Sequence, residues 1–168
     1  MRVIGYGSFL NKESLAKTIV PRPVELILVK GYRRIFNLKA SHLRQYKVQD
    51  PLKVAVLNVI PDAEAFLNAI LFEVNEDEFE KLKIRNKNYY TKEVEVYNFK
   101  TNEQNGTAIL FIGKKLEHGE RVVEDHYLPI PQYLELCKKG AYDYGESFGD
   151  FFMKTTYTTD GKNLEEYS

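Results

Sequence analysis

The chain has 168 residues, a length typical of one domain with its own hydrophobic core. Its 24 lysines and arginines are balanced by 24 aspartates and glutamates, so no whole-chain field would attract nucleic acid or an anionic membrane. Its single cysteine, Cys137, cannot form an intrachain disulfide, and no Cys/His spacing suits a zinc site.

The N-terminal segment predicts a strand, a tight loop and a short helix. Residues 3–6 are an apolar run that enters Gly5-Tyr6-Gly7, which is typical of a buried strand followed by a sharp turn. Asn11 precedes a segment with helical spacing of apolar residues, so we expect it to cap a short helix over 12–19 that stops at Pro21.

The next segments read as strands. Residues 23–29 and 32–38 are expected to meet at a bend or bulge at Lys30-Gly31. Residues 53–60 form another apolar run, and Pro61-Asp62 after it predicts a turn.

A strong helix start follows the apolar run at residues 67–74. Asn75 precedes Glu76-Asp77-Glu78, which combines a side-chain cap, acids at the positive end of the dipole and an acid at the third helical position. This helix is expected to carry Phe79 and Leu82 inward and to end near Lys83.

A hairpin is expected in the second half of the chain. Residues 90–97 alternate in polarity, with Tyr90, Val94 and Val96 on one face, and they pair with residues 107–112. The connection contains Asn105-Gly106, a dipeptide that favours hairpin turns.

Two more helices are predicted near the C-terminus. Pro131 opens one, and residues 145–153 form the other. Residues 157–168 are mostly polar and are expected to be a frayed tail after a single domain over 1–156. Because most strands follow one another through short turns, we expect an α+β fold whose mainly antiparallel sheet is closed or strongly curled into a small barrel, with a few flanking helices.

The loop Gly5-Tyr6-Gly7-Ser8-Phe9-Leu10 is the most informative segment. Two glycines after a buried strand allow a sharp turn with exposed N–H groups, which suits a carboxylate or an oxyanion. Leu10 stands where a dinucleotide fingerprint needs a third glycine, and no phosphate-loop lysine follows. From spacing alone, a plain strand-to-helix turn remains the simpler interpretation.

Several blocks resemble one family in its own order. The run from Val3 to Leu10 resembles the Tyr-Gly-Ser-x-Leu loop of the γ-glutamylcyclotransferase-like family, and residues 31–37 resemble its Gly-Tyr-x-x-x-Phe-Asn segment. Residues 69–74 are similar to its strand before the catalytic helix, and residues 79–90 to its Leu-Asp-x-Arg-Glu-x-x-Tyr region. Residues 131–145 resemble its C-terminal Pro-x-x-Tyr helix and glycine turn.

The resemblance implies release of 5-oxoproline from a γ-glutamyl amine or dipeptide by intramolecular cyclisation, with no cofactor and no metal. In this reaction the substrate's α-amine attacks its own γ-amide carbonyl, helped by oxyanion donors, a carboxylate base and a close-fitting pocket. The residues that the resemblance implies for substrate binding are Tyr6, Gly7, Ser8, Phe9, Leu10, Tyr90 and Tyr133.

The sequence departs from the family at the base. Arg85 is followed by Asn86, where the family has its catalytic Glu. An amide has nearly the shape of a carboxylate but accepts no proton at neutral pH, so binding can survive where turnover does not. Loss of a general base typically costs about 10²–10⁴-fold in rate.

Other acids are expected to have ordinary roles. The acids of the predicted helix are interpreted as solvated and dipole-compensating, and those of the following strand as lysine partners. These residues are Glu76, Asp77, Glu78 and Glu80, and then Glu93 and Glu95.

The remaining candidates are weaker. His42, His118 and His126 lie in polar contexts, and the members of Glu124-Asp125-His126 point in different directions in any regular element. Arg33-Arg34 beside aromatic residues resembles a nucleic-acid patch, but in a strand the two arginines face opposite sides. Cys137 is expected to be inert core.

Three functions remain open: the enzyme, a binding module that keeps the pocket without the base, and a partner-binding domain with a vestigial pocket. The expected partner is a small γ-glutamyl or amino-acid-like molecule, with no nucleic acid and no membrane. The N-terminus lacks the apolar segment of a signal peptide, and the longest apolar stretch is far below the ~20 residues of a membrane span, so a cytoplasmic location is expected.

Overall fold

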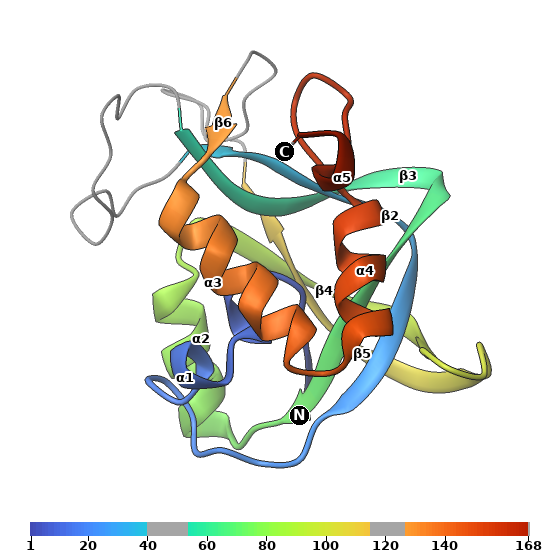
Figure 1. The fold of residues 1–168 in the computed structure, drawn as a ribbon. Coiled ribbons are helices and arrows are strands. Elements are labelled where there is room, and N and C mark those ends of the chain that lie inside the picture. Colours follow the sequence, from blue (N-terminus) through green and yellow to red (C-terminus); the bar gives the residue numbers. More distant parts are fainter. Residues whose placement is uncertain (40–53, 115–126, 168) are drawn as a thin grey trace.

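The computed structural model describes residues 1–39, 54–114 and 127–167, and within them the strands form a closed barrel (Figure 1). Its ring runs through β1 (Arg2–Gly5), β5 (Gln104–Gly113), β4 (Tyr89–Asn98), β2 (Glu25–Lys39) and β3 (Val54–Glu73), and β3 pairs again with β1. Two short strands lie outside this ring: β6 (Leu128–Pro129) pairs in parallel with β3, and β7 (Thr156–Tyr157) pairs in parallel with β2. In the ring β1 and β5 are parallel and the other pairs antiparallel. The predicted fold class is therefore confirmed.

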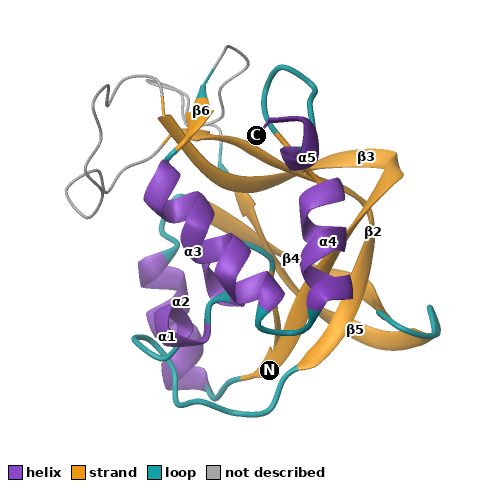
Figure 2. Cartoon of the chain, viewed as in Figure 1, coloured by secondary structure: helices purple, strands orange, loops and turns teal. Residues whose placement is uncertain are grey.

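The helices cover one side and one end of the barrel (Figures 1 and 2). They are the 3₁₀ helix η1 (Ser8–Leu10), α1 (Lys12–Leu15), α2 (Glu76–Arg85), α3 (Pro131–Tyr142), α4 (Glu146–Lys154) and α5 (Leu164–Tyr167). Helix α3 packs closely on the end of η1 at Gly140. A Cβ at this position would lie only 2.5 Å from the backbone N of Asn11, so a side chain there would clash. Among the described helices, none has the length and apolar character needed to cross a membrane.

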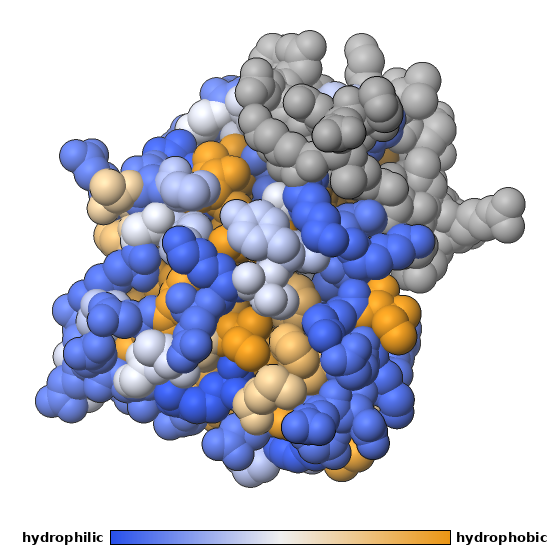
Figure 3. Space-filling model, turned by 180° about the vertical axis from the view of Figure 1, so that it is seen from behind, coloured by the Kyte–Doolittle hydropathy of each residue, from blue (hydrophilic) through white to orange (hydrophobic). Residues whose placement is uncertain are grey.

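Aromatic rings fill much of the core. Phe36, Phe72, Phe148 and Phe152 are fully buried, and Phe9 meets Phe72 edge to face with ring centroids 6.0 Å apart. Each such ring contributes about 1.5–3 kcal/mol when it leaves water. In the view from behind, hydrophilic residues cover most of the coloured surface, and hydrophobic ones show between them as separate patches (Figure 3). The high aromatic content is therefore largely internal.

Side-chain caps place the starts of α1 and α2 where the sequence predicted them, but α1 ends at Leu15, before the expected end at residue 19. Asn11 accepts a hydrogen bond from the Ser14 N–H at 3.0 Å, and Asn75 forms a reciprocal capping box with Glu78. The box satisfies N–H groups at the start of α2, which then continues to Arg85, past the expected end. The expectation that Glu78 is solvated is wrong: its side chain is 7% exposed and pairs with Arg22 at 2.7 Å.

The turn predicted at Pro61-Asp62 is wrong, because β3 continues through it to Glu73. Lys30 pairs with Phe66 and Tyr32 pairs with Pro61, so residues 62–65 form a bulge opposite Gly31. A bulge tolerates proline, since no ladder hydrogen bond requires its missing N–H. The bulge predicted at Lys30-Gly31 is confirmed, and Pro61 is the last paired residue before it.

The hairpin of β4 and β5 is confirmed, but its turn is not at Asn105-Gly106. The chain reverses around Asn102, which has a φ of 61°, and the Asn98 side chain accepts from the N–H groups of Lys100 and Thr101. Gly106 has a φ of 72° and lies within β5, opposite the register shift between Glu95 and Tyr97. Its backbone freedom therefore serves a bulge and not the turn.

The C-terminal segment is packed, so the expectation of a frayed tail is wrong for residues 157–167. Thr156 and Tyr157 pair in parallel with Arg34 and Ile35 of β2. Leu164, in α5, is buried in the core. A mostly polar segment is held here by strand pairing and one apolar anchor.

Candidate functional site

A small pocket lies where the loop after β1 meets α3, the end of α2 and the start of β4. Its volume is about 30 Å³. Its lining residues come from five separate parts of the chain: Ile4, Tyr6, Gly7, Ser8, Phe9, Leu57, Asn86, Tyr89, Phe111 and Tyr133. A larger cleft of about 860 Å³ adjoins it and shares Ser8, Asn86, Tyr89 and Tyr133. The pocket and the cleft therefore meet at these four residues.

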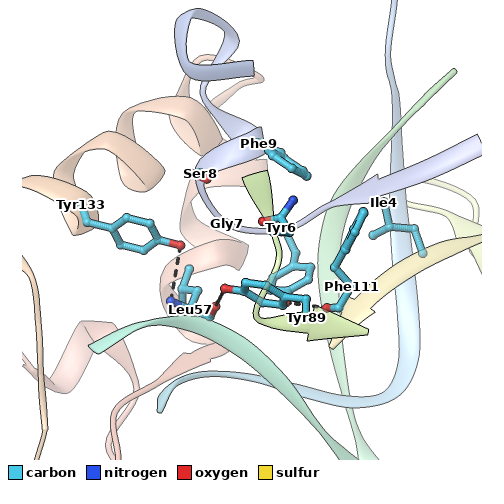
Figure 4. Close-up of a pocket in the computed structure, with 10 residues that line it drawn as sticks. Ile4, Tyr6, Gly7, Ser8, Phe9, Leu57, Tyr89, Phe111 and Tyr133 are labelled. Carbon is cyan, nitrogen blue, oxygen red and sulfur yellow. Dashed lines mark hydrogen bonds between the residues drawn. The ribbon is translucent and has the colours of Figure 1, made fainter. Parts of the chain in front are cut away.

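Three tyrosines surround the pocket, and their hydroxyl groups are anchored to the barrel (Figure 4). The Tyr6 hydroxyl donates to the Phe111 carbonyl at 2.7 Å, and the Tyr89 hydroxyl donates to the Leu57 carbonyl at 2.8 Å. The Tyr133 hydroxyl accepts from the Leu57 N–H at 3.4 Å. Burial raises the pKa of all three tyrosines, so they are neutral at physiological pH and none is a tyrosinate base.

Gly7 lies against Tyr133. A Cβ at residue 7 would be 2.9 Å from the Tyr133 hydroxyl oxygen and 3.4 Å from the Leu57 Cβ. Only a glycine lets the loop pass this close without displacing a neighbour. The second glycine of the Gly-Tyr-Gly motif therefore serves the contact between the loop and α3.

The structure places most of the predicted site residues together. Tyr6, Gly7, Ser8, Phe9, Asn86 and Tyr133 all line the pocket. Leu10 is instead fully buried, and its N–H closes η1 by donating to the Gly7 carbonyl at 3.0 Å. Of the five loop residues that the sequence suggested, the four from Tyr6 to Phe9 therefore line the pocket.

Tyr90 is 46% exposed, and its neighbour Tyr89 lines the pocket in its place. Successive side chains of a strand point to opposite faces of the sheet. Of the neighbours Tyr89 and Tyr90, only one ring can therefore point into the pocket. The family resemblance implied Tyr90, the last residue of the matching block at 79–90. Tyr90 is not among the residues that line the pocket or the cleft.

Asn86 caps the C-terminus of α2 with both of its nitrogen atoms. Its backbone N–H and its side-chain Nδ2 donate to the same Leu82 carbonyl, at 2.9 and 3.0 Å. The amide nitrogen is thus held by the helix, and the Oδ1 is left as an acceptor. Among the described residues that line the pocket and the cleft, none carries a carboxylate.

Arg85, one residue earlier, ties the end of α2 to the loop. Its Nη1 donates to the Ser14 carbonyl at 2.8 Å and to the Thr18 hydroxyl at 2.9 Å. Its Nη2 donates to the hydroxyls of Ser14 at 2.7 Å and Ser8 at 3.3 Å. The guanidinium also lies over the Phe9 ring, 4.8 Å from its centroid. The sequence indicated only that an arginine precedes residue 86, not that it positions Ser8.

Arg34 supports the loop from the barrel interior, a role that the sequence analysis missed. It is fully buried, and it donates to the Tyr6 carbonyl at 3.2 Å and to the Asn68 carbonyl and Oδ1 at 2.6 and 2.7 Å. It also donates to the hydroxyls of Thr156 at 2.6 Å and Thr155 at 2.9 Å. Burial lowers the pKa of this guanidinium to about 9, so it stays charged at neutral pH. The available signal was its parity with the apolar Tyr32 and Phe36 in one strand.

Some candidates fall elsewhere. Cys137 is fully buried, as expected, and burial raises the pKa of its thiol to about 12, which keeps it protonated. His42, His118 and the Glu124-Asp125-His126 run lie outside the described residues.

Solved structures with the same barrel and helix arrangement identify the class of fold. A γ-glutamyl cyclotransferase aligns with a TM-score of 0.65 at 14% identity over 90% of this chain and 85% of its own. A yeast γ-glutamyl cyclotransferase specific to glutathione aligns with a TM-score of 0.64 at 12% identity over 99% and 96%. An uncharacterized human protein aligns with a TM-score of 0.66 at 13% identity over 90% and 85%. The fold is that of the γ-glutamylcyclotransferase-like proteins.

The sequence itself defines the family. Residues 1–126 match the family described as ChaC-like protein, and the chain belongs to this family. No curated protein sequence matches the chain. The resemblance seen in the sequence is thus confirmed at the level of the family.

Proposed function

We propose that this chain binds a small γ-glutamyl or amino-acid-like compound in the pocket at Asn86, and that the described lining of this pocket lacks the base that cyclisation requires. The observation that supports this most directly is the position of Asn86. It lines the pocket made by the Tyr-Gly-Ser loop, while the described lining of the pocket and cleft carries no carboxylate.

The volume of the pocket limits how a ligand enters it. A space of about 30 Å³ is two to three times the roughly 10–15 Å³ that one water molecule needs, so only a small terminal group fits inside. A carboxylate or an ammonium group has that size. The rest of the ligand would lie in the adjoining cleft, past Tyr89 and Tyr133, which border both spaces.

The chemistry of cyclisation explains why binding and turnover separate here. The α-amine nitrogen forms a bond to the γ-carbonyl carbon, the bond from that carbon to the leaving nitrogen breaks, and a proton moves from the amine to the leaving group. A carboxylate carries that proton in both directions. The Asn86 amide neither accepts nor releases a proton as a base or acid near neutral pH, and the raised pKa values of the three pocket tyrosines argue against a tyrosinate base.

The test compares the parent chain with Asn86→Glu. Each protein is incubated with a panel of γ-glutamyl amines and dipeptides, and 5-oxoproline is measured. We expect background release from the parent and a gain of about 10²–10⁴-fold in Asn86→Glu, the usual contribution of a general base. Asn86→Gln is the matched control, because it has the length of Glu without the acid.

Binding is measured separately by the shift of the melting temperature, since a ligand that binds only the native state raises stability. A panel compound should stabilise the parent even where no product forms. Turnover by the parent equal to that of Asn86→Glu would contradict the assignment of residue 86. So would an Asn86→Glu variant that folds and binds but stays inactive.

A further inference from the structure

The cleft beside the pocket is lined by cations from three elements. Lys17 follows α1, Arg85 and Lys87 lie at the end of α2, and Lys39 ends β2. No acidic residue accompanies them among the described lining residues. In a chain with equal numbers of acidic and basic residues, this local excess is a property of the site and not of the composition.

The lysines of the cleft differ from other lysines in their surroundings. Lys83 pairs with Glu80 at 2.6 Å and Lys139 with Asp143 at 2.9 Å. Within the described part of the chain, Lys17, Lys39 and Lys87 form no such ion pair. Arg85 is held by Ser8, Ser14 and Thr18, so its charge has a fixed position at the junction of pocket and cleft.

Clefts lined by one sign of charge concentrate ligands of the opposite sign. The space of about 860 Å³ is large enough for a molecule of tripeptide size. Because the cations come from separate elements around the cleft, they match negative charges spread along a ligand better than one compact anion.

We infer that the cleft is a subsite for γ-glutamyl compounds whose part beyond the γ-amide carries two or more carboxylates, such as an oligo-γ-glutamate. This inference rests on the proposed function, since the terminal glutamyl group would reach the pocket at Asn86. Each further γ-linked glutamate adds an α-carboxylate within reach of the lysines. Selectivity then comes from the charge of the distal part of the ligand.

The test is isothermal titration calorimetry on the full chain with three compounds. They are γ-glutamyl-methylamide, with no distal carboxylate, γ-glutamyl-glycine, with one, and tri-γ-glutamate, with three. We expect tri-γ-glutamate to bind about 10-fold tighter than the methylamide at low salt, because exposed ion pairs add modest increments that salt screens. The difference should shrink as sodium chloride is raised.

Two double variants locate the effect. Lys17→Gln with Lys87→Gln should remove most of the advantage of tri-γ-glutamate and leave methylamide binding unchanged. Lys92→Gln with Lys100→Gln removes the same charge from exposed positions of the β4–β5 hairpin and should change neither. Circular dichroism checks that each variant is folded.

The outcomes separate the two proposals. If none of the three compounds binds, the proposed function fails. If all bind equally, or if the cleft variant keeps its preference for tri-γ-glutamate, only the anionic subsite is overturned. Tripolyphosphate binding tighter than tri-γ-glutamate would also overturn it, because the cleft would then be a phosphate site.

Discussion

Tyr6 separates two polar regions of the barrel that differ in how their polar groups are satisfied. On one side its carbonyl accepts from Arg34, whose three guanidinium nitrogens all donate to atoms of the protein. On the other side its ring lines the pocket with Asn86, where the described lining offers acceptors and no charge partner. The first region is closed and contributes to stability, whereas the second is open and available to a ligand.

The largest effect is expected from breaking the closed region with Arg34→Met. The substitution leaves the Tyr6 and Asn68 oxygens without their donor, at a cost of about 1–3 kcal/mol for each buried unpaired group. We expect a total loss of about 3 kcal/mol in the free energy of unfolding, or roughly 6–12 °C in melting temperature. Urea denaturation measures it.

Arg33→Met is the matched control for this prediction. Arg33 is the next residue on the same strand, with a half-exposed side chain that pairs with Asp62 at 2.8 Å. A surface ion pair contributes about 0–1 kcal/mol, so this variant should stay close to the parent. Equal losses in the two variants would show that burial of Arg34 has no special energetic role.

An intermediate effect is expected from closing the open region with Gly7→Ala. The new Cβ would lie 2.9 Å from the Tyr133 hydroxyl oxygen, so the ring or the loop has to move. Overpacking of this kind costs about 1–3 kcal/mol, and ligand binding should weaken because both groups line the pocket. Thermal unfolding and the ligand-induced melting shift report the two changes.

The double variant Gly7→Ala with Tyr133→Phe tests the cause. Removing the hydroxyl removes the atom that the methyl group meets, so much of the lost stability should return. If the double variant is as unstable as the sum of the single ones, the contact between Gly7 and Tyr133 is not the reason.

The smallest effect is expected at a second place where polar groups are satisfied within the protein, the ion pair between Arg22 and Glu78 at the start of α2. The Arg22 guanidinium beside Glu78 lowers the pKa of that carboxyl from 4.5 to about 2. A lowered pKa stabilises the fold above pH 4.5, and this contribution is lost as the pH falls toward 2. Glu78→Gln should cost about 1.5 kcal/mol at pH 7 and flatten the decline of stability in acid.

Glu80→Gln serves as the comparison for Glu78→Gln, because Glu80 lies on the same helix with an exposed side chain paired to Lys83. Stability curves between pH 7 and pH 2 should coincide for Glu80→Gln and the parent. An acid transition in Glu78→Gln as steep as that of the parent would assign the pH dependence to other carboxylates.

The parts of the fold that follow from neighbouring residues were predictable. The caps at Asn11 and Asn75 act within four residues, so the helices begin where the sequence places them. The turn dipeptides, by contrast, did not predict where the chain turns. Pro61 lies inside β3 beside a bulge, and Asn105-Gly106 lies inside β5 at a bulge set by its pairing with β4. Their conformation depends on pairing with residues that are distant in the sequence.

The candidate site shows the same contrast between features set by neighbouring residues and features set by distant ones. The Gly-Tyr-Gly loop, Tyr133 and the amide at residue 86 could be recognised from the sequence, since each belongs to a contiguous motif. The pocket is lined by Tyr89 and not by Tyr90, and this depends on the orientation of β4 in the barrel. The positive charge of the cleft arises because three elements bring their cations together there.

The sequence by itself determined the family, the capped helices and the amide at residue 86, because local hydrogen bonds and side-chain chemistry require no distant partner. Only the tertiary structure decided that Arg34 is a buried support and Arg33 a surface ion pair. Whether a polar group is satisfied inside the protein or left facing a cleft depends on atoms that folding brings from far along the chain. For Arg34 those atoms belong to Tyr6, Asn68, Thr155 and Thr156.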